Sequence, residues 1–488
     1  MRSCFHDYNA TSKLWSSQRI ITVTMHNNKW LVPIVIVTLL AAIIFPLVYN
    51  GYSSIKRGEA EFARQDFAGA ADSFSRAARF LPWRADLWEQ AGIAAGNAGD
   101  TSRAIIFLKR APQLSEQGWL VLAYSHYASN DIPSALNAYQ QGLRSFDSPS
   151  LYAGLAYIYR QQKNWFAEMD ALKNQVRLDA GDVYAHYRVG LLLSFLEPEQ
   201  ALSELMLASS LDLQTDSAVQ TLRSALNIAA AQPDPSAQFV TIGRALGLVQ
   251  EWDLSIAAFE KAIALNAENA EAWAWLGEAK QQTGQNGSVE LDRALTLDHT
   301  SITVRALRGL YWNRQQKYSQ MLAEYLLAAE YEPTNPAWQA EIGNAYFKRG
   351  DISAALTAYQ QATNIAPTAS TYWRLLAVFC ADNNVHMEDI GLPAAQKAVE
   401  LAPDDPFALD ALGWSFLASG RYANAAQILL DVTKRFPDHL AAHIHLAMTY
   451  LAQDDRTAAF NELIYVRDAD GNGADGLFAT QLLEKYFP

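Results

Sequence analysis

Residues 335–368 read NPAWQAEIGNAYFKRGDISAALTAYQQATNIAPT and set out the plan of the chain. Apolar residues recur at helical spacing from Trp338 to Phe347, stop at the polar residues 348–351, and resume from Ile352 onward. Pro367 follows the second run, and proline is common just beyond the end of a helix. The stretch therefore predicts two antiparallel helices joined by a tight turn.

A glycine or alanine returns at a nearly constant interval along most of the chain. Successive members of this series lie 31 to 36 residues apart, except for one interval of 53 residues. The series is Gly58, Gly92, Ala123, Ala156, Gly190, Gly243, Gly277, Gly309, Gly343, Ala377, Gly413 and Ala447. In most copies a large apolar residue stands sixteen residues later, as Phe74 and Tyr359 do. Such periodicity predicts a stack of two-helix units that pack only on their neighbours.

The order and spacing of these residues resemble the tetratricopeptide repeat family. The pattern is complete in Gly343, Tyr346, Ala355, Tyr359, Ala362 and Pro367. It recurs in Gly58, Ala70, Phe74, Ala77 and Pro82, and in Gly413, Phe416, Gly420, Tyr422, Ala425 and Pro437. The resemblance implies an all-α fold, namely a right-handed α-solenoid of about twelve tetratricopeptide-like helix hairpins.

The interval of 53 residues, from Gly190 to Gly243, indicates a seam in the array. It holds a run of helical character at 218–231, and Pro233 and Pro235 follow, where proline ends helices. We therefore expect an extra helix between two blocks of repeats. The expected organisation is a polar and disordered tail at 1–29, a transmembrane helix at 30–49, a first repeat block at 51–212, the seam at 213–235, a second repeat block at 236–470 and a capping helix at 471–488.

Two units depart from the regular pattern. The unit after Gly277 is shortened and lacks the large aromatic residue of the second helix. Between Cys380 and Ala395, two surplus residues around 383–386 imply a longer turn between the helices.

Residues 30–49 read WLVPIVIVTLLAAIIFPLVY and carry no charge. As a helix this segment would be ~30 Å long, enough to cross the hydrocarbon core of a bilayer. Trp30 and Tyr49 stand at its ends, where such side chains favour the membrane interface. No small-residue cleavage pattern follows it. The segment predicts an uncleaved single-pass anchor in the cell membrane, and the alternative interpretation is a buried core helix.

The charges beside this segment bear on its orientation. Basic residues precede it at Arg2, Lys13, Arg19 and Lys29, and follow it at Lys56, Arg57 and Arg64. By the positive-inside rule, this balance places the repeats outside the cytoplasm. If the chain begins at Met25 instead, only Lys29 precedes the apolar segment.

Composition excludes some classes of function. The net charge of −13 argues against a nucleic-acid partner, which needs clustered lysine and arginine. The two cysteines, Cys4 and Cys380, lie far apart in the sequence and define no disulfide scaffold. Cys380 occupies a position that holds a large apolar residue in other repeats, so we expect it to be buried.

The resemblance implies that an extended peptide or a helix binds the concave face, which the first helix of each unit lines. Some relatives clamp a C-terminal carboxylate with lysine, arginine and asparagine side chains on this face. At the matching positions of this chain, only Asn344 and Arg374 are residues of that kind. We therefore do not expect such a clamp here. Instead this face carries aromatic residues, which are frequent hot spots of binding: Tyr124, Tyr127, Tyr157, Tyr187 and Trp414. The hypothesis is that they contact a protein partner; the alternative is packing between repeats.

Two further groups of residues could carry chemistry. His439, His443 and His445 form a histidine cluster, and His439 and His443 have the i, i+4 spacing of a metal pair. Asp468, Asp470 and Asn472 match the first half of a calcium-binding loop, but Ala479 stands where the closing glutamate belongs. Ordinary surface histidines and a polar turn are the alternatives that we favour. We expect no enzymatic activity, no cofactor and no small-molecule substrate.

These observations predict a membrane-anchored scaffold that recruits or holds other proteins at the membrane. The alternative is a permanent structural or assembly subunit of a multi-protein membrane complex, in which the anchor packs against the helices of its partners.

Overall fold

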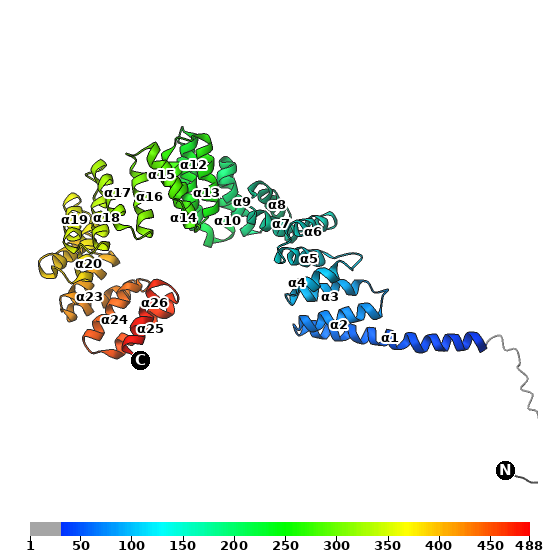
Figure 1. Cartoon of the computed structure of the whole chain (residues 1–488). Helices are drawn as coiled ribbons and strands as arrows, with labels where there is room; N and C mark the ends of the chain where they lie inside the picture. Colours follow the sequence, from blue (N-terminus) through cyan, green and yellow to red (C-terminus); the bar gives the residue numbers. More distant parts are fainter. Residues whose placement is uncertain (1–30) are drawn as a thin grey trace, which may run out of the picture. The chain divides into compact units, whose positions relative to one another are not determined.

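The computed structural model of the protein describes residues 31–488, and within this range it is entirely helical (Figure 1). These residues form 26 α-helices and no strand, so the predicted all-α fold is confirmed. The expectations for the tail at 1–29, and for Cys4, Met25 and Trp30, lie outside the described residues.

The chain packs as two compact units, and each is described by itself. The first unit ends at Ala185 and the second begins at His186. The first contains α1 (Leu31–Ala63), α2 (Phe67–Phe80), α3 (Asp86–Asn97), α4 (Thr101–Leu108), α5 (Glu116–Ala128), α6 (Ile132–Ser145), α7 (Pro149–Gln161), α8 (Trp165–Leu178) and the first residues of α9 (Val183–Leu196).

The second unit holds the rest of α9 and every later helix. These are α10 (Pro198–Leu211), α11 (Asp216–Ala230), α12 (Pro235–Leu248), α13 (Trp252–Leu265), α14 (Ala270–Gln282), α15 (Ser288–Leu297), α16 (Ile302–Arg314), α17 (Tyr318–Tyr331), α18 (Pro336–Lys348), α19 (Ile352–Ile365), α20 (Ser370–Asn383), α21 (Leu392–Leu401), α22 (Pro406–Ala418), α23 (Tyr422–Arg435), α24 (Leu440–Ala452), α25 (Arg456–Asp470) and α26 (Ala474–Tyr486). A short 3₁₀ helix (Leu213–Thr215) precedes α11.

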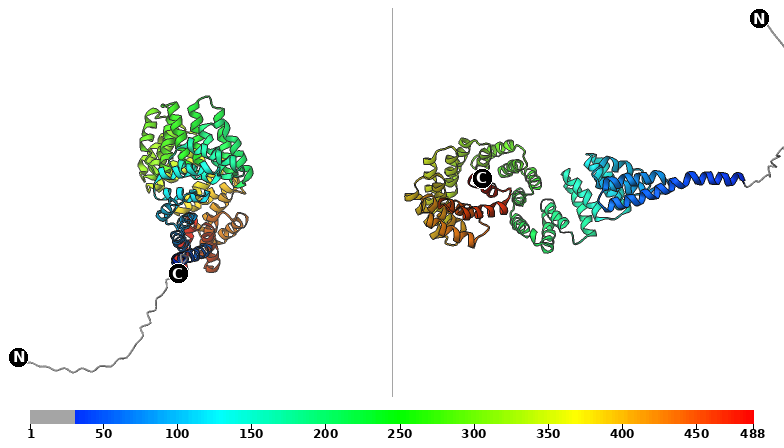
Figure 2. Two further views of the ribbon diagram at one scale, coloured as in Figure 1. Left: turned by 90° about the vertical axis from the view of Figure 1, so that its right-hand side faces the viewer. Right: turned by 90° about the horizontal axis from the view of Figure 1, so that it is seen from below.

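Consecutive helices pair as antiparallel hairpins, and each hairpin packs on the next within its unit (Figures 1 and 2). Five hairpins run from α1 to α10, and seven run from α12 to α25. The predicted number of about twelve hairpins is therefore confirmed. α11 stands alone between α10 and α12, and α26 packs against α24 and α25 at the end of the array.

The small residues of the series lie where the two helices of one hairpin approach each other. A Cβ atom added to Gly243 would come within 2.6 Å of the Phe259 ring, and one added to Gly58 within 2.9 Å of the Phe74 ring. Phe259 is 1% exposed, so the ring completely fills the space that glycine leaves. In these hairpins a large side chain of the second helix is seated on a small residue of the first, and the same holds for Gly309 with Tyr325, Gly343 with Tyr359 and Gly413 with Leu429.

The shortened unit after Gly277 replaces the aromatic ring with a backbone contact. α15 begins late, at Ser288, and Gly287 immediately before it lies against Gly277 of α14. A Cβ atom on Gly287 would overlap the Gly277 carbonyl oxygen, so only glycine fits this approach. Leu291, which is buried, then occupies the place of the missing ring.

The two surplus residues in the unit of Cys380 form a turn of unusual backbone. Asn384 and His386 both have left-handed conformations, with φ of 50° and 51°. A π-helical turn (Met387–Gly391) follows and leads directly into α21. The longer turn that the sequence predicts is thus resolved as a left-handed step and one wide helical turn.

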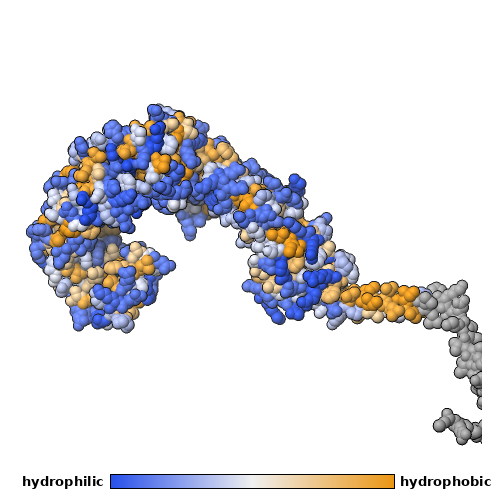
Figure 3. All heavy atoms as spheres, viewed as in Figure 1, coloured by the Kyte–Doolittle hydropathy of each residue, from blue (hydrophilic) through white to orange (hydrophobic). Residues whose placement is uncertain are grey.

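α1 is one continuous helix of 33 residues that joins the apolar segment to the first repeat. Figure 3 shows its apolar part as a protruding hydrophobic rod. Val48 packs against the core of the first hairpins, and Leu81 occupies the space beside Gly51. α1 therefore continues without a break from the anchor predicted at 30–49 into the repeat predicted from 51. Side chains of the first hairpin already cover α1 at this junction. By length and composition α1 is able to cross a membrane.

We predict that Gly287→Ala destabilises the hairpin of α14 and α15 by about 1–3 kcal/mol, the usual cost of overpacking. The overlap would involve backbone, which cannot rotate away as a side chain can. Amide hydrogen exchange should speed up in both helices. Gly181→Ala is the control, since a Cβ there meets only the Asp179 carboxylate at 3.5 Å. Equal protection in both variants would contradict the backbone contact.

We also predict that Cys380 resists alkylation in the folded protein. Its thiol is fully buried, and burial raises its pKa to about 12, so little thiolate exists near neutral pH. Pulse alkylation at pH 8 followed by mass spectrometry should modify Cys380 only after denaturant is added. A cysteine introduced at the exposed Phe166 should react at once; comparable rates at both positions would contradict the prediction.

Candidate functional site

The first helices of successive hairpins form one continuous surface in each unit, which we call the first-helix face. In the first unit, Tyr124 and Tyr127 lie one turn apart on α5, and Tyr157 and Arg160 lie one turn apart on α7. Ser115 and Ser148 cap the N-termini of these helices and so fix where each begins. Equivalent turns of neighbouring helices therefore bring these side chains together.

Four tyrosines of this face form what we call the tyrosine strip: Tyr124, Tyr127, Tyr157 and Tyr184. The rings of Tyr127 and Tyr157 meet edge to face with centroids 5.4 Å apart. The Tyr127 hydroxyl donates to the Tyr157 hydroxyl at 3.4 Å, and this contact raises the pKa of Tyr127. Tyr124, Tyr157 and Tyr184 remain 59%, 50% and 56% exposed. The strip thus offers aromatic surface that packing between repeats does not use.

Arg160 supplies positive charge beside the strip. Its Nη1 donates to the Tyr184 hydroxyl at 2.5 Å, and its guanidinium lies 5.8 Å from the centre of the same ring. The buried carboxylate of Glu168 holds Arg160 from the other side at 3.4 Å. Arg160 is therefore fixed in place between the Tyr184 ring and the Glu168 carboxylate.

A pocket continues the first-helix face towards α1. Its volume is about 360 Å³, and its walls come from α1, α2, α3 and α5. Phe62, Phe74 and Ile93 supply apolar lining, while Glu59, Gln90 and Gln117 supply polar groups. Gln117 lies seven residues before Tyr124 on α5, which places both on one side of that helix. The pocket and the tyrosine strip thus belong to one surface.

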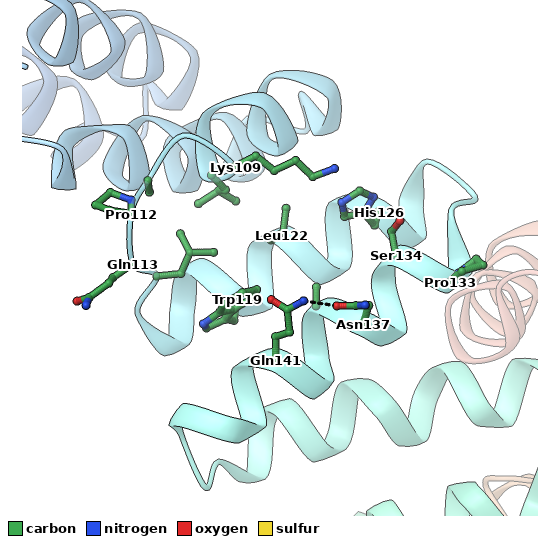
Figure 4. A pocket seen from close by; sticks show the side chains of 14 residues that line it. Lys109, Pro112, Gln113, Trp119, Leu122, His126, Pro133, Ser134, Asn137 and Gln141 are labelled. Atoms are coloured by element: carbon green, nitrogen blue, oxygen red, sulfur yellow. Dashed lines mark hydrogen bonds between the residues drawn. The ribbon is translucent and has the colours of Figure 1, made fainter.

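A second hollow of about 530 Å³ lies where α4 is short (Figure 4). α4 ends at Leu108 after eight residues, so it leaves Trp119 and Leu122 of α5 and Asn137 of α6 lining the hollow. His126 also lines it; burial, aided by the charge of Lys109, lowers the pKa of this histidine. A neutral imidazole paired with Asp131 acts here as a hydrogen-bonding group.

The remaining predicted partner residues, Tyr187 and Trp414, belong to the second unit. Tyr187 is half-buried on α9, and burial raises its pKa. The Trp414 indole donates to Asp382 at 2.8 Å and stacks on His445 with ring centres 4.5 Å apart. Trp414 is thus engaged by its own unit, as the packing alternative expects. That these two residues contact a partner stays a prediction.

Each member of the histidine cluster pairs with a carboxylate. His445 Nδ1 lies 2.7 Å and His439 Nε2 3.5 Å from Asp410, while His443 Nδ1 lies 2.6 Å from Glu462. Asp410 and His443 are buried. Across residues 31–488, no group of three or more histidine, cysteine, aspartate or glutamate residues is arranged to hold a metal ion. The cluster joins α22, α24 and α25 instead.

The residues that match a calcium-binding loop have a different geometry at the C-terminal end of α25. Asp468 and Asp470 lie in the last turn of that helix, and Asn472 follows it. Asp468 pairs with Arg467, and an Asp470 oxygen accepts from the Gly476 backbone at 3.0 Å. A calcium loop instead turns its alternate oxygens towards one centre. Asp470 here connects α25 to the start of α26.

Sequence reasoning missed several residues of this site. Tyr184 and Arg160 were not singled out, and neither were the pocket residues Phe62 and Ile93. Tyr184 stands six residues before Gly190, as Gln117 stands six before Ala123. Listing that position in every repeat, besides the positions nearer the small residue, would have identified Tyr184.

Comparison with known proteins identifies the repeat. A TPR repeat model matches residues 343–379, and a tetratricopeptide repeat model matches residues 120–188, 240–284 and 411–473. A TPR repeat-containing protein of Pseudomonas aeruginosa is 45% identical over 49 residues, which are 10% of this chain and only 8% of that protein. Among solved structures, yeast Tom70 has 16% identity and a TM-score of 0.41, with 89% of this chain and 95% of that chain covered. The APC/C hetero-tetramer Cut9–Hcn1 has 14% identity and a TM-score of 0.41, with 90% and 96% covered.

We predict that Asp410 makes the second unit sensitive to acid. Burial opposes its ionisation, but His445 and His439 outweigh burial and lower the pKa of Asp410. A carboxylate whose pKa falls on folding stabilises the protein above its unfolded pKa, about 3.9, and that contribution is lost as the pH falls through the folded value. Asp410→Asn should therefore lower the unfolding temperature at pH 6 and flatten its decline below pH 4.

Thermal unfolding monitored by circular dichroism across this pH range would measure the effect. Asp404→Asn is the control, because that carboxylate is exposed and should contribute little. Parallel curves for Asp410→Asn and the unaltered protein would show that Asp410 has no such role.

Proposed function

Because the chain belongs to the tetratricopeptide repeat family, we propose that it is a membrane-anchored scaffold that holds an extended segment of a partner protein on the first-helix face of its first unit. The single observation that carries this proposal is the tyrosine strip. Three of its rings are about half exposed although they lie at positions where neighbouring helices offer packing partners.

The chemistry of the strip suits a partner segment with apolar and acidic groups. Tyrosine provides a large contact area at low cost in conformational entropy, and aromatic residues are frequent hot spots. Arg160 offers a fixed cation to a partner carboxylate, and the pocket beside Phe62 and Ile93 accommodates an apolar side chain. The pocket and the strip together take residues from α1, α3, α5, α7 and the start of α9. This succession of neighbouring helices suits the binding of an extended chain.

The anchor in this proposal is the apolar part of α1. Its large side chains, including Ile36, Leu40 and Phe45, are exposed, and a protein in water rarely leaves so continuous an apolar surface uncovered. A bilayer covers such a surface along its whole circumference. The slight excess of basic residues before the segment favours repeats outside the cytoplasm.

A permanent subunit of a membrane complex is the alternative that uses the same anchor. Size measurement after gentle detergent extraction separates the two functions. A scaffold that recruits its partners should be recovered largely alone, whereas a permanent subunit should co-purify in a fixed ratio with other chains.

We predict that Tyr124→Ala, Tyr157→Ala and Tyr184→Ala together strongly weaken partner binding. Three hot-spot contacts of more than about 1 kcal/mol each predict a loss of roughly 100-fold in affinity. Photo-crosslinking from position 124 in cells would identify the bound segment, and calorimetry with that segment would measure its affinity.

The matched control is Phe166→Ala with Tyr422→Ala, since both rings are exposed and neither belongs to the strip. Trp414→Ala, measured alone, tests whether the second unit takes part. Undiminished affinity in the triple variant, with its helical content retained, would rule out the strip as the binding surface.

A further inference from the structure

The loop between α2 and α3 lies beside the end of the apolar segment of α1. α1 and α2 run antiparallel, with Gly58 against Phe74 and Gly51 against Leu81. Leu81 is fully buried in this contact, so the loop at 81–85 is held in place against α1. Following the same register, Trp83 stands level with Tyr49, the last residue of the apolar run.

Three aromatic side chains at this level are exposed. Tyr49 is 66%, Tyr52 is 48% and Trp83 is 61% exposed. Trp83 comes from the loop, whereas the two tyrosines come from α1 itself. Together the three rings form an exposed aromatic group at one end of the first hairpin, and such a group marks a surface that contacts a membrane or another protein.

The charged groups nearby suit a lipid headgroup layer. Lys56 and Arg57 follow Tyr52 by about one turn, and Arg79 precedes the loop; all three are exposed. The carboxylates in the same region include Asp86, which pairs with Arg84 at 2.7 Å, and Glu61, which pairs with Arg57 at 2.8 Å. Tryptophan and tyrosine with flanking basic residues are the side chains that concentrate at membrane interfaces.

No spacer separates the apolar segment from the first repeat. Val48 already packs against the core of the first hairpins, so a bilayer that covers α1 up to Val48 must place its headgroups at the loop. The pocket that adjoins the tyrosine strip begins at Glu59. Glu59 lies about 15 Å beyond Tyr49 along α1, given the 1.5 Å rise per residue. The binding surface would thus start close to the membrane.

We propose that Trp83, together with Tyr49 and Tyr52, inserts into the headgroup layer of the membrane that α1 spans. This inference rests on the membrane anchor of the proposed function. The first unit is then docked on the bilayer at two elements, α1 and the α2–α3 loop, and cannot rotate freely about a single tether. The partner segment is accordingly presented at a fixed height above the lipid.

Spin-label depth measurements on the full chain test this inference. Cys4 is replaced by serine, and the remaining native cysteine, Cys380, is buried and does not react. In this background, single cysteines replace Trp83, Leu40 or Phe166 and are labelled with a nitroxide. The proteins are reconstituted in vesicles of phosphatidylcholine and phosphatidylglycerol, and collision rates with oxygen and with a water-soluble nickel chelate are compared. Phe166 is the matched control, because it is an exposed aromatic residue at the opposite ends of the hairpins.

We expect the label at 40 to report the hydrocarbon core, the label at 83 the headgroup region and the label at 166 water. If position 83 is as accessible to the chelate as position 166 while position 40 is buried in lipid, the second contact is refuted and the anchor stands. If position 40 is itself accessible to the chelate, the anchor fails and the inference fails with it. Trp83 is an exposed loop residue, so its replacement leaves the core of the hairpin intact.

Discussion

The close approach of two helices at a small residue is the constraint on which the rest of the structure depends. A ring such as Phe259 fills the space that Gly243 leaves, and the hairpin closes around that contact. Because the interaction is local, each hairpin needs only its neighbours for stability. Regularity at this one position is what allows twelve hairpins of otherwise different composition to stack in the same manner.

Local packing also explains why the first-helix face is available for the proposed binding. The second helix of each hairpin supplies the large side chain, so the outward positions of the first helix are released from the core. In the first unit these positions hold tyrosines, with Arg160 fixed between Glu168 and Tyr184. In the second unit Trp414 stacks on His445 and binds Asp382, so the same kind of position there serves to join repeats. One register thus leaves tyrosines exposed for the proposed binding in the first unit and joins repeats in the second.

The periodic contacts between helices could be predicted from the sequence, because a glycine or alanine at a nearly constant interval marks each of them. The continuity of α1 could not, since nothing in the letters at Asn50 and Gly51 tells whether Leu81 covers the helix there. The shortened unit was recognised, but its substitute, Gly287 against Gly277, depends on backbone atoms that no side-chain pattern records. For the site, Tyr124, Tyr127 and Tyr157 were named from register, and Tyr184 required one further register position, six residues before the small residue. Arg160 emerges only from its contacts with Tyr184 and Glu168 in the structure. The ends of helices were hardest: Asp468 and Asp470 have the spacing of a loop and lie in a helix.

The unbroken passage of α1 from its apolar half to its repeat half has a consequence for how the chain is made. Residues after Gly51 supply half of the first hairpin, and α2 supplies the other half. If α1 is the membrane anchor that we propose, its apolar half is synthesised before α2 and enters the lipid before α2 reaches its partner. For such an anchor, membrane integration precedes the first tertiary contact, and the remaining hairpins assemble outward from a helix that the lipid already holds.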